Sequence, residues 1–149
     1  MHKESGFTLI ELLAVIAILS VLSFMGITAF ATYKSSAAYA VAEQTYADSR
    51  RAMEAGLNDI DRELPDVSLV SQKAKGMLQD SGARSLFVGF MVPDNVRFTA
   101  SFDPTCEEEG CERSMIQVNH CLGKEAIRWV QFGNGLDILF DHLASEGCN

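Results

Sequence analysis

Proline is missing from the first 64 residues of this 149-residue chain, and charged residues are missing from a long run within them. The chain has three prolines, and none of them precedes Pro65. Proline interrupts helices because it lacks a backbone N–H and its ring clashes with the preceding turn. In addition, no charged side chain occurs from Leu12 to Ala31, a run of 20 residues, which is the length of a membrane-spanning helix. These absences exclude an ordinary soluble N-terminal region and favour an uninterrupted apolar helix.

Basic residues are too few for a protein that binds nucleic acid. Lysine and arginine number 12 against 20 aspartates and glutamates, which gives a net charge of −8. Binding to nucleic acid or to an anionic lipid surface needs clustered positive charge, so neither is expected. The overall composition, 48% apolar and 21% charged, is close to a globular average and excludes a disordered or collagen-like chain.

Cysteine is absent before residue 106, and all four cysteines follow in the C-terminal part: Cys106, Cys111, Cys121 and Cys148. An even, clustered set behind an export-like segment favours disulfides formed in an oxidising compartment. Three pairings are possible. We expect Cys106 with Cys111, a turn-sized loop of about six residues, and Cys121 with Cys148, a loop of about 28 residues that is the more stabilising of the two.

Motifs for catalysis and cofactors are also missing. The chain has no nucleophile elbow, P-loop, glycine-rich dinucleotide turn or HExxH helix, so no enzyme and no cofactor are expected. The acidic segment 106–112 lacks the oxygen-ligand pattern of an EF-hand and is interpreted as a solvated loop. His120, Cys121, His142 and Cys148 contain atoms that bind zinc, but their spacing matches no zinc motif. We therefore expect no metal site.

A helical period continues beyond the apolar run. Apolar and small residues recur at steps of three and four between Tyr39 and Leu64, and charged residues fall between them. One helix from about residue 7 to about residue 63 is predicted, and it would be on the order of 80 Å long. A compact domain of this size cannot bury such a helix, so it is expected to protrude, with its first half in lipid or against copies of itself.

The remaining residues predict a small antiparallel sheet and hence an α+β fold. Ser68 to Asp80 is expected to be a short helix or an ordered loop. Pro93 to Asn95 and Gly133 to Gly135 have the composition of turns, the first of them suited to a hairpin. The predicted strands are Leu86 to Val92, Val96 to Phe102, Met115 to Leu122, Ala126 to Phe132 and Leu136 to Leu143.

The segment Gly6-Phe7-Thr8-Leu9-Ile10-Glu11, placed between a short leader with Lys3 and the apolar run, resembles the class III signal and N-terminal helix of type IV pilins and pseudopilins. The resemblance implies cleavage by the prepilin peptidase between Gly6 and Phe7 and N-methylation of Phe7. It also implies that Glu11 pairs with the N-terminal amino group of a neighbouring subunit during assembly. Thr28 stands where members of the family usually have a proline.

The resemblance divides the chain into a leader (1–6), an apolar membrane and polymerisation helix (7–33), an amphipathic continuation of that helix (34–63) and an α+β head with two disulfides (64–149). It implies a type IV pilus subunit that is held in the inner membrane by a single span, handled by the assembly machinery there, and then polymerised into a cell-surface filament. A pseudopilin of a type II secretion system shares the N-terminal pattern. A protein of another class, a periplasmic binding or redox module, would instead be exported by an ordinary signal peptide cut after Ala31, because Ala29-Phe30-Ala31 has the form of such a cleavage site.

Overall fold

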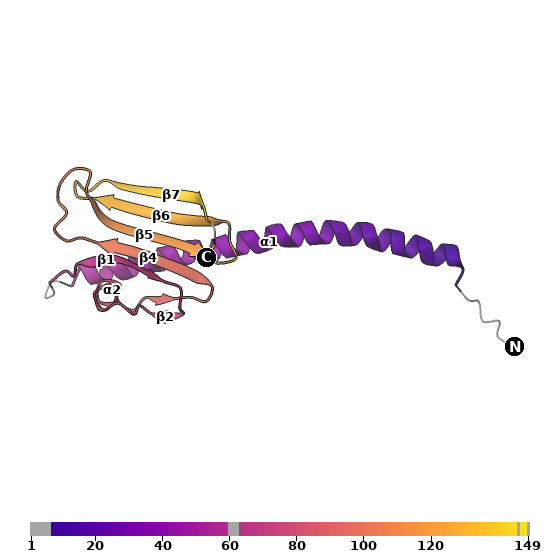
Figure 1. Cartoon of the computed structure of the whole chain (residues 1–149), viewed down its shortest axis with the longest axis horizontal. Helices are drawn as coiled ribbons and strands as arrows, with labels where there is room; N and C mark the ends of the chain where they lie inside the picture. Colours follow the sequence, from indigo (N-terminus) through magenta and orange to yellow (C-terminus); the bar gives the residue numbers. More distant parts are fainter. Residues whose placement is uncertain (1–6, 60–62, 146, 149) are drawn as a thin grey trace. The chain divides into compact units, whose positions relative to one another are not determined.

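The computed structural model describes residues 7–59, 63–145 and 147–148, except for the side chain of Thr28. A single long helix, α1 (Leu9–Leu57), begins the fold and a series of strands follows it (Figure 1). The chain divides into two compact units, residues 1–34 and residues 35–149. Helix α1 contributes to both units, and each unit is described by itself.

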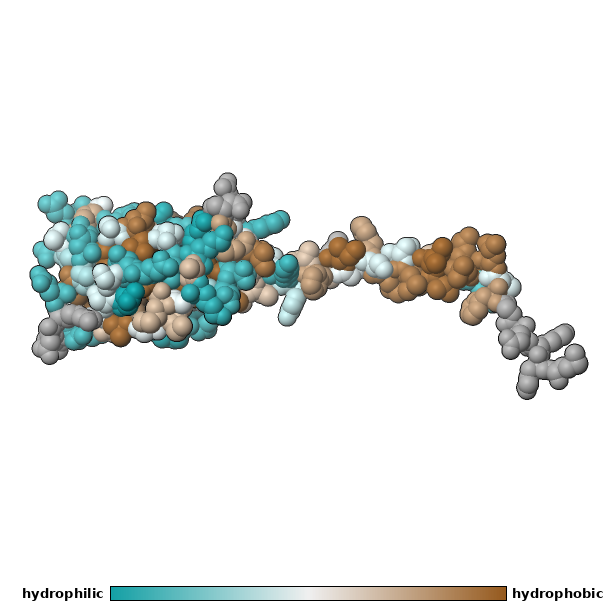
Figure 2. All heavy atoms as spheres, turned by 60° about the horizontal axis from the view of Figure 1, so that its bottom comes forward, coloured by the Kyte–Doolittle hydropathy of each residue, from teal (hydrophilic) through white to brown (hydrophobic). Residues whose placement is uncertain are grey.

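The N-terminal unit consists of the first half of α1, and its described side chains are almost all exposed. One 18-residue window of this helix has a mean hydropathy of 2.5 and no buried residue, so α1 is long and apolar enough to cross a membrane. Figure 2 shows this half of α1 as a nearly continuous apolar surface. The helix continues through Gly26 without interruption, as the absence of proline predicts.

Helix α1 ends at Leu57, earlier than the predicted end near residue 63. The amide of Asn58 still bonds to the carbonyl of Glu54 at 3.1 Å, but the amide of Asp59 bonds to the carbonyl of Gly56 at 3.4 Å. This change from four-residue to three-residue hydrogen bonds tightens the last turn. Asn, Asp and Gly are all poor helix formers, which explains why the helix stops here although the apolar spacing continues.

The second unit contains a five-stranded antiparallel sheet with the strand order β1-β4-β5-β6-β7 (Figure 1). A separate two-stranded sheet is formed by β2 and β3, and the short helix α2 lies between these two strands in the sequence. The bounds are β1 (Val67–Gln72), β2 (Gly76–Met77), α2 (Ser81–Leu86), β3 (Met91–Val92), β4 (Val96–Phe102), β5 (Glu112–His120), β6 (Glu125–Phe132) and β7 (Asp137–Ala144). A long helix packed against a small antiparallel sheet is the α+β arrangement that the sequence predicts.

The core lies between the sheet and the second half of α1. Burial alternates strictly along β4, so that Phe98 and its neighbours two residues away face the core. Small residues of α1, among them Ala42 and Ser49, are fully buried and let the helix approach the sheet closely. Trp129 of β6 is also buried there, with the guanidinium of Arg50 3.7 Å from its ring centroid. The sheet is therefore covered by α1 on one face.

Two predicted elements were wrong. Residues 68–80 contain strands β1 and β2 where a helix or an ordered loop was expected. The strand predicted from Leu86 to Val92 is reduced to the two residues of β3, and its first residue, Leu86, is the last residue of α2. The side chain of Asp80 accepts a hydrogen bond from the amide of Ala83 at 2.8 Å, so Asp80 caps the start of α2, a helix that was not predicted. Strand β3 pairs with β2 and not with β4, so the turn at 93–95 joins no hairpin.

The four long strands β4 to β7 confirm the predicted runs, with bounds that differ by a few residues. The turn at 133–135 joins β6 to β7 as a hairpin, with Gly135 at a φ of 85°. This positive φ is accessible to glycine at little cost, which explains the strength of the sequence signal. Strand β7 is the last strand of the sheet and pairs only with β6 in the part of the chain that the structure describes.

Candidate functional site

The N-terminal end of α1 is closed by a reciprocal pair of hydrogen bonds between Thr8 and Glu11. The Glu11 carboxylate accepts from the backbone N–H of Thr8 at 2.8 Å and from the Thr8 hydroxyl at 2.7 Å. In return, the Thr8 hydroxyl oxygen accepts from the Glu11 amide at 3.4 Å. This is a capping box, which satisfies two backbone N–H groups that a helix start otherwise leaves unpaired. Thr8 therefore fixes the position of the Glu11 carboxylate.

The Glu11 carboxylate is surrounded by exposed apolar side chains of the same helix. Leu9, Ile10, Leu12 and Leu13 are each more than half exposed, and so is Phe7 at 84%. Both hydrogen bonds that the carboxylate accepts within the described residues use the same oxygen, Oε2. Gly6, on the other side of the predicted cleavage position, lies outside the described residues. A negative charge thus sits at the start of an apolar helix, where the helix dipole also favours it.

The role of Thr8 was missed by the sequence analysis. A Thr-x-x-Glu pattern directly before an apolar run is the signature of a capping box, so the signal was present in Thr8-Leu9-Ile10-Glu11. That segment was interpreted only through its resemblance to the pilin signal. Glu11 therefore has an interaction within its own chain in addition to the predicted interaction with a neighbouring subunit.

Four cysteines can form two disulfides in three ways, and the structure has the way that links Cys106 to Cys111 and Cys121 to Cys148. The loop closed by the first disulfide packs against the β6–β7 turn, where the amide of Gly133 donates to the carbonyl of Cys111 at 3.0 Å. A Cβ at Gly133 would lie 2.7 Å from the backbone of Glu107, so only glycine permits this approach. The acidic loop is thereby fixed to the end of the sheet.

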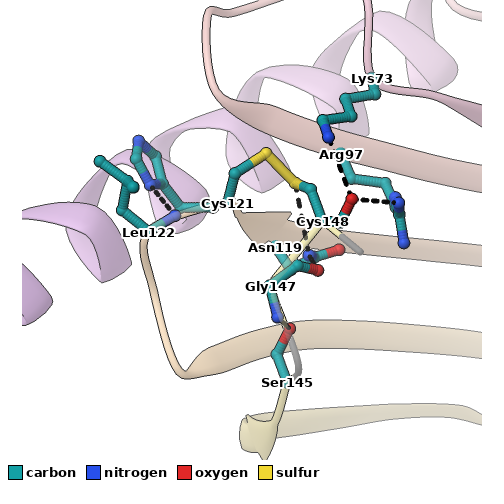
Figure 3. Close-up of a disulfide and its surroundings, with 9 residues drawn as sticks. Lys73, Arg97, Asn119, Cys121, Leu122, Ser145, Gly147 and Cys148 are labelled. Carbon is teal, nitrogen blue, oxygen red and sulfur yellow. Dashed lines mark hydrogen bonds between the residues drawn. A yellow bond between two sulfur atoms is a disulfide. The ribbon is translucent and has the colours of Figure 1, made fainter.

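The second disulfide links Cys148 to Cys121, directly after β5, and hydrogen bonds from three side chains surround this link (Figure 3). The carbonyl of Cys148 accepts hydrogen bonds from Lys73 at 3.0 Å and from Arg97 at 2.8 Å. The side chain of Asn119 donates to the carbonyl of Gly147 at 2.5 Å. Lys73 follows β1, Arg97 lies on β4 and Asn119 lies on β5. Residues 147 and 148 are therefore held by one covalent link and by hydrogen bonds from Lys73, Arg97 and Asn119.

The residues that contain zinc-binding atoms have other partners in the structure. Within the described ranges, no group of three or more His, Cys, Asp or Glu side chains could hold a metal ion. Cys121 and Cys148 are bonded to each other, and the ring of His120 accepts a hydrogen bond from the amide of Leu122 at 3.2 Å. Partial burial lowers the pKa of His120. His142 has other partners, Glu125 on β6 and Tyr39 on α1.

The start of the chain matches a known family model. Residues 1–27 match the family model described as the prokaryotic N-terminal methylation motif. No curated protein and no solved structure matches the chain. The motif supports the interpretation that the chain is an exported protein similar to type IV pilins or pseudopilins. It also implies processing by the prepilin peptidase. The apolar helix fits anchoring in a membrane. The chain therefore carries the N-terminal methylation motif, the class III signal of type IV pilins, at the start of a long apolar helix.

Proposed function

We propose that this protein is the structural subunit of a type IV pilus. In this account the prepilin peptidase cleaves between Gly6 and Phe7, Phe7 is N-methylated, and the mature chain polymerises through the apolar half of α1 into an extracellular filament. The observation that carries the proposal is the methylation motif on a helix whose apolar side chains are exposed over a membrane-spanning length. In a filament these side chains would be buried against copies of the same helix.

Glu11 is proposed to select the register of assembly. Cleavage at Phe7 creates a positive α-amino group, and a carboxylate on a neighbouring helix attracts it by about 4 kcal/mol at 4 Å and an effective dielectric of 20. Each charge alone is costly in lipid, so pairing between subunits is favoured over separation. The capping box supports this role because Thr8 holds the carboxylate through one oxygen, Oε2, in a fixed position at the end of α1.

Replacing Glu11 by glutamine separates the effect of the negative charge on assembly from its effect on the helix cap. Glu11→Gln keeps an amide oxygen that can accept from the Thr8 amide, and glutamine is compatible with a capping box, but the negative charge is lost. We expect this variant to be inserted into the membrane and cleaved normally and to produce few or no filaments in electron micrographs. Thr8→Ala is the matched control, since it removes the hydroxyl contact and keeps the charge, and we expect it to retain filaments. Filaments at the wild-type number in the Glu11→Gln strain would contradict the proposed role.

A pseudopilin of a type II secretion system is the second candidate, because the N-terminal features apply equally to it. The presence of two disulfides favours the surface pilin. The two candidates differ in what a strain without this protein loses. Loss of surface filaments with normal secretion supports the pilin, whereas retention of secreted proteins in the periplasm supports the pseudopilin.

A further inference from the structure

The turn between β6 and β7 contains Asn134-Gly135, the dipeptide in which asparagine deamidates most readily. In this reaction the backbone nitrogen of Gly135 attacks the side-chain carbon Cγ of Asn134. The N–Cγ bond forms, the bond from Cγ to the side-chain nitrogen breaks, and ammonia leaves with the proton of the attacking amide. Water then opens the cyclic imide to aspartate or isoaspartate. Glycine has no side chain to hinder the attack, and both residues are exposed.

Both groups that would react are held by hydrogen bonds in this turn. The amide of Gly135 donates to the carbonyl of Phe132 at 3.0 Å. The side-chain oxygen Oδ1 of Asn134 accepts from the amide of Leu136 at 3.0 Å. The nitrogen of the imide carries no hydrogen, so the bond from Gly135 to Phe132 must break before the ring can form. The closed turn therefore opposes the reaction.

The turn is held closed from outside by the loop of the shorter disulfide. Gly133, the residue before Asn134, donates its amide hydrogen to the carbonyl of Cys111 at 3.0 Å. A Cβ at Gly133 would lie 2.7 Å from the backbone of Glu107 and 3.0 Å from the carbonyl oxygen of Cys106, so this loop packs directly on the turn. Opening of the turn at Gly133 must therefore disturb the contact with the loop, which raises the free energy of local opening.

We propose that Asn134 is a deamidation site and that the loop closed by the Cys106–Cys111 disulfide protects it. Without this disulfide the loop gains conformational freedom, and Gly133 loses the fixed surface on which it packs. The turn then opens more often and frees the nitrogen of Gly135. Aspartate at this position adds a negative charge to a turn that packs on the acidic segment 107–109, and isoaspartate also lengthens the backbone of the hairpin by one carbon. Protection of the turn is a role for the short disulfide in addition to its stabilisation of the head.

Mass spectrometry of the purified full-length chain after prolonged incubation in neutral buffer tests the proposal. Peptide maps measure the fraction of Asn134 whose side-chain amide has become a carboxyl group, and chromatography separates the isoaspartate product. Cys106→Ser with Cys111→Ser should increase the rate at least about tenfold, because the local opening that limits the reaction becomes more frequent. Cys121→Ser with Cys148→Ser is the matched control, since this disulfide begins before β6 whereas the turn follows β6. We expect no increase in the control.

Asn95 is an internal reference in every sample, because the valine that follows it hinders the same attack. It should stay unmodified. Gly133→Ala keeps both disulfides and forces a Cβ against the loop, so it should also increase deamidation of Asn134, and it serves as the test if the cysteine variants fold poorly.

Three results would overturn the proposal. The first is an equal rate in the native chain and in the variant without the Cys106–Cys111 disulfide. The second is an equal increase in both disulfide variants, which would indicate general unfolding instead of a local effect. The third is a rate in the native chain as high as in the same chain unfolded in urea, which would show that the closed turn gives no protection.

Discussion

The ring of Tyr39 on α1 stacks on the imidazole of His142 on β7, with centroids 4.5 Å apart and planes at 9°. The Tyr39 hydroxyl donates to the carboxylate of Asp141, and Nδ1 of His142 lies 2.9 Å from Oε2 of Glu125 on β6. Partial burial, followed by the hydrogen bond to Asp141, raises the pKa of Tyr39 to about 12. Strand β7, otherwise exposed, is therefore attached to α1 and β6 near its C-terminal end.

The attachment of β7 is expected to weaken as pH rises. The hydrogen bond to Glu125 is the largest effect and raises the pKa of His142 above its ordinary value of 6.5. Burial lowers this pKa by less, and the negative charges of Glu125, Asp141 and Glu43 raise it further. A pKa that is raised in the folded state gives a stabilisation that is complete below the unfolded value and is lost as pH rises through the folded value. Hydrogen exchange of the β7 amides, corrected for intrinsic rates, should therefore show less protection above the raised pKa than below 6.5.

His142→Asn is the control for this pH dependence. His142 has a φ of 52°, a left-handed conformation that asparagine tolerates better than most residues. The variant therefore keeps the backbone and removes the titrating group. We expect the change in β7 protection with pH to disappear. An unchanged dependence in His142→Asn would show that another group is responsible.

Gly56 of α1 allows the backbone of α2 to approach the helix. A Cβ at Gly56 would lie 2.0 Å from the carbonyl oxygen of Leu86, a contact that backbone movement alone can relieve. Gly56→Ala should reduce the free energy of unfolding by about 1–3 kcal/mol, the usual cost of overpacking. The fluorescence of Trp129, the one tryptophan of the chain, can follow unfolding because this side chain packs against Arg50 of α1.

Gly26→Ala is the control for Gly56→Ala, because it adds a methyl group to the same helix at a position where the new Cβ would have no other atom within 4 Å. It should leave the unfolding transition of the head unchanged. Equal stability of the two variants would contradict the close contact between α1 and α2.

Loss of the longer disulfide loop should destabilise the head more than loss of the shorter one. The Cys121–Cys148 link spans 27 positions and the Cys106–Cys111 link spans 5. In the chain-entropy model the two contribute about 3 to 4 and about 2 kcal/mol, respectively. Cys148→Ser also releases the segment that Lys73 and Arg97 hold. Thermal unfolding of Cys148→Ser and Cys111→Ser gives the comparison, and a lower transition temperature for Cys111→Ser would reverse the expected order.

The elements that the sequence predicted well are those whose burial follows a regular period. Strand β4 alternates between buried and partly buried residues along its whole length, and the same alternation is visible in its amino acids. The segment after β1 is organised differently. Gln72 is buried, and its side-chain amide donates to the carbonyls of Ala74 and Met77 and accepts from the amide of Gln79. The conformation of this segment thus depends on one polar side chain, and the spacing of apolar residues in the sequence does not indicate it.

Candidate site residues could be predicted from the sequence when their chemistry depends on residues close to them in the chain. Glu11 could be singled out because it belongs to a short motif, residues 6–11, directly before the apolar run. The contacts of the C-terminal segment could not be predicted, because Lys73 and Arg97 lie 75 and 51 residues from Cys148. The two side chains can reach the same carbonyl only because β1 and β4 are paired in the sheet.

The N-terminus of the exported protein tests the central claim most directly. Intact-mass measurement and N-terminal sequencing of the protein from the cell surface should find a chain that begins at methylated Phe7. That result would show processing by the prepilin peptidase, which the pilin proposal requires. A chain that begins at Thr32 would contradict the account, because it would show an ordinary signal peptide cut after Ala31 and no apolar helix left for polymerisation.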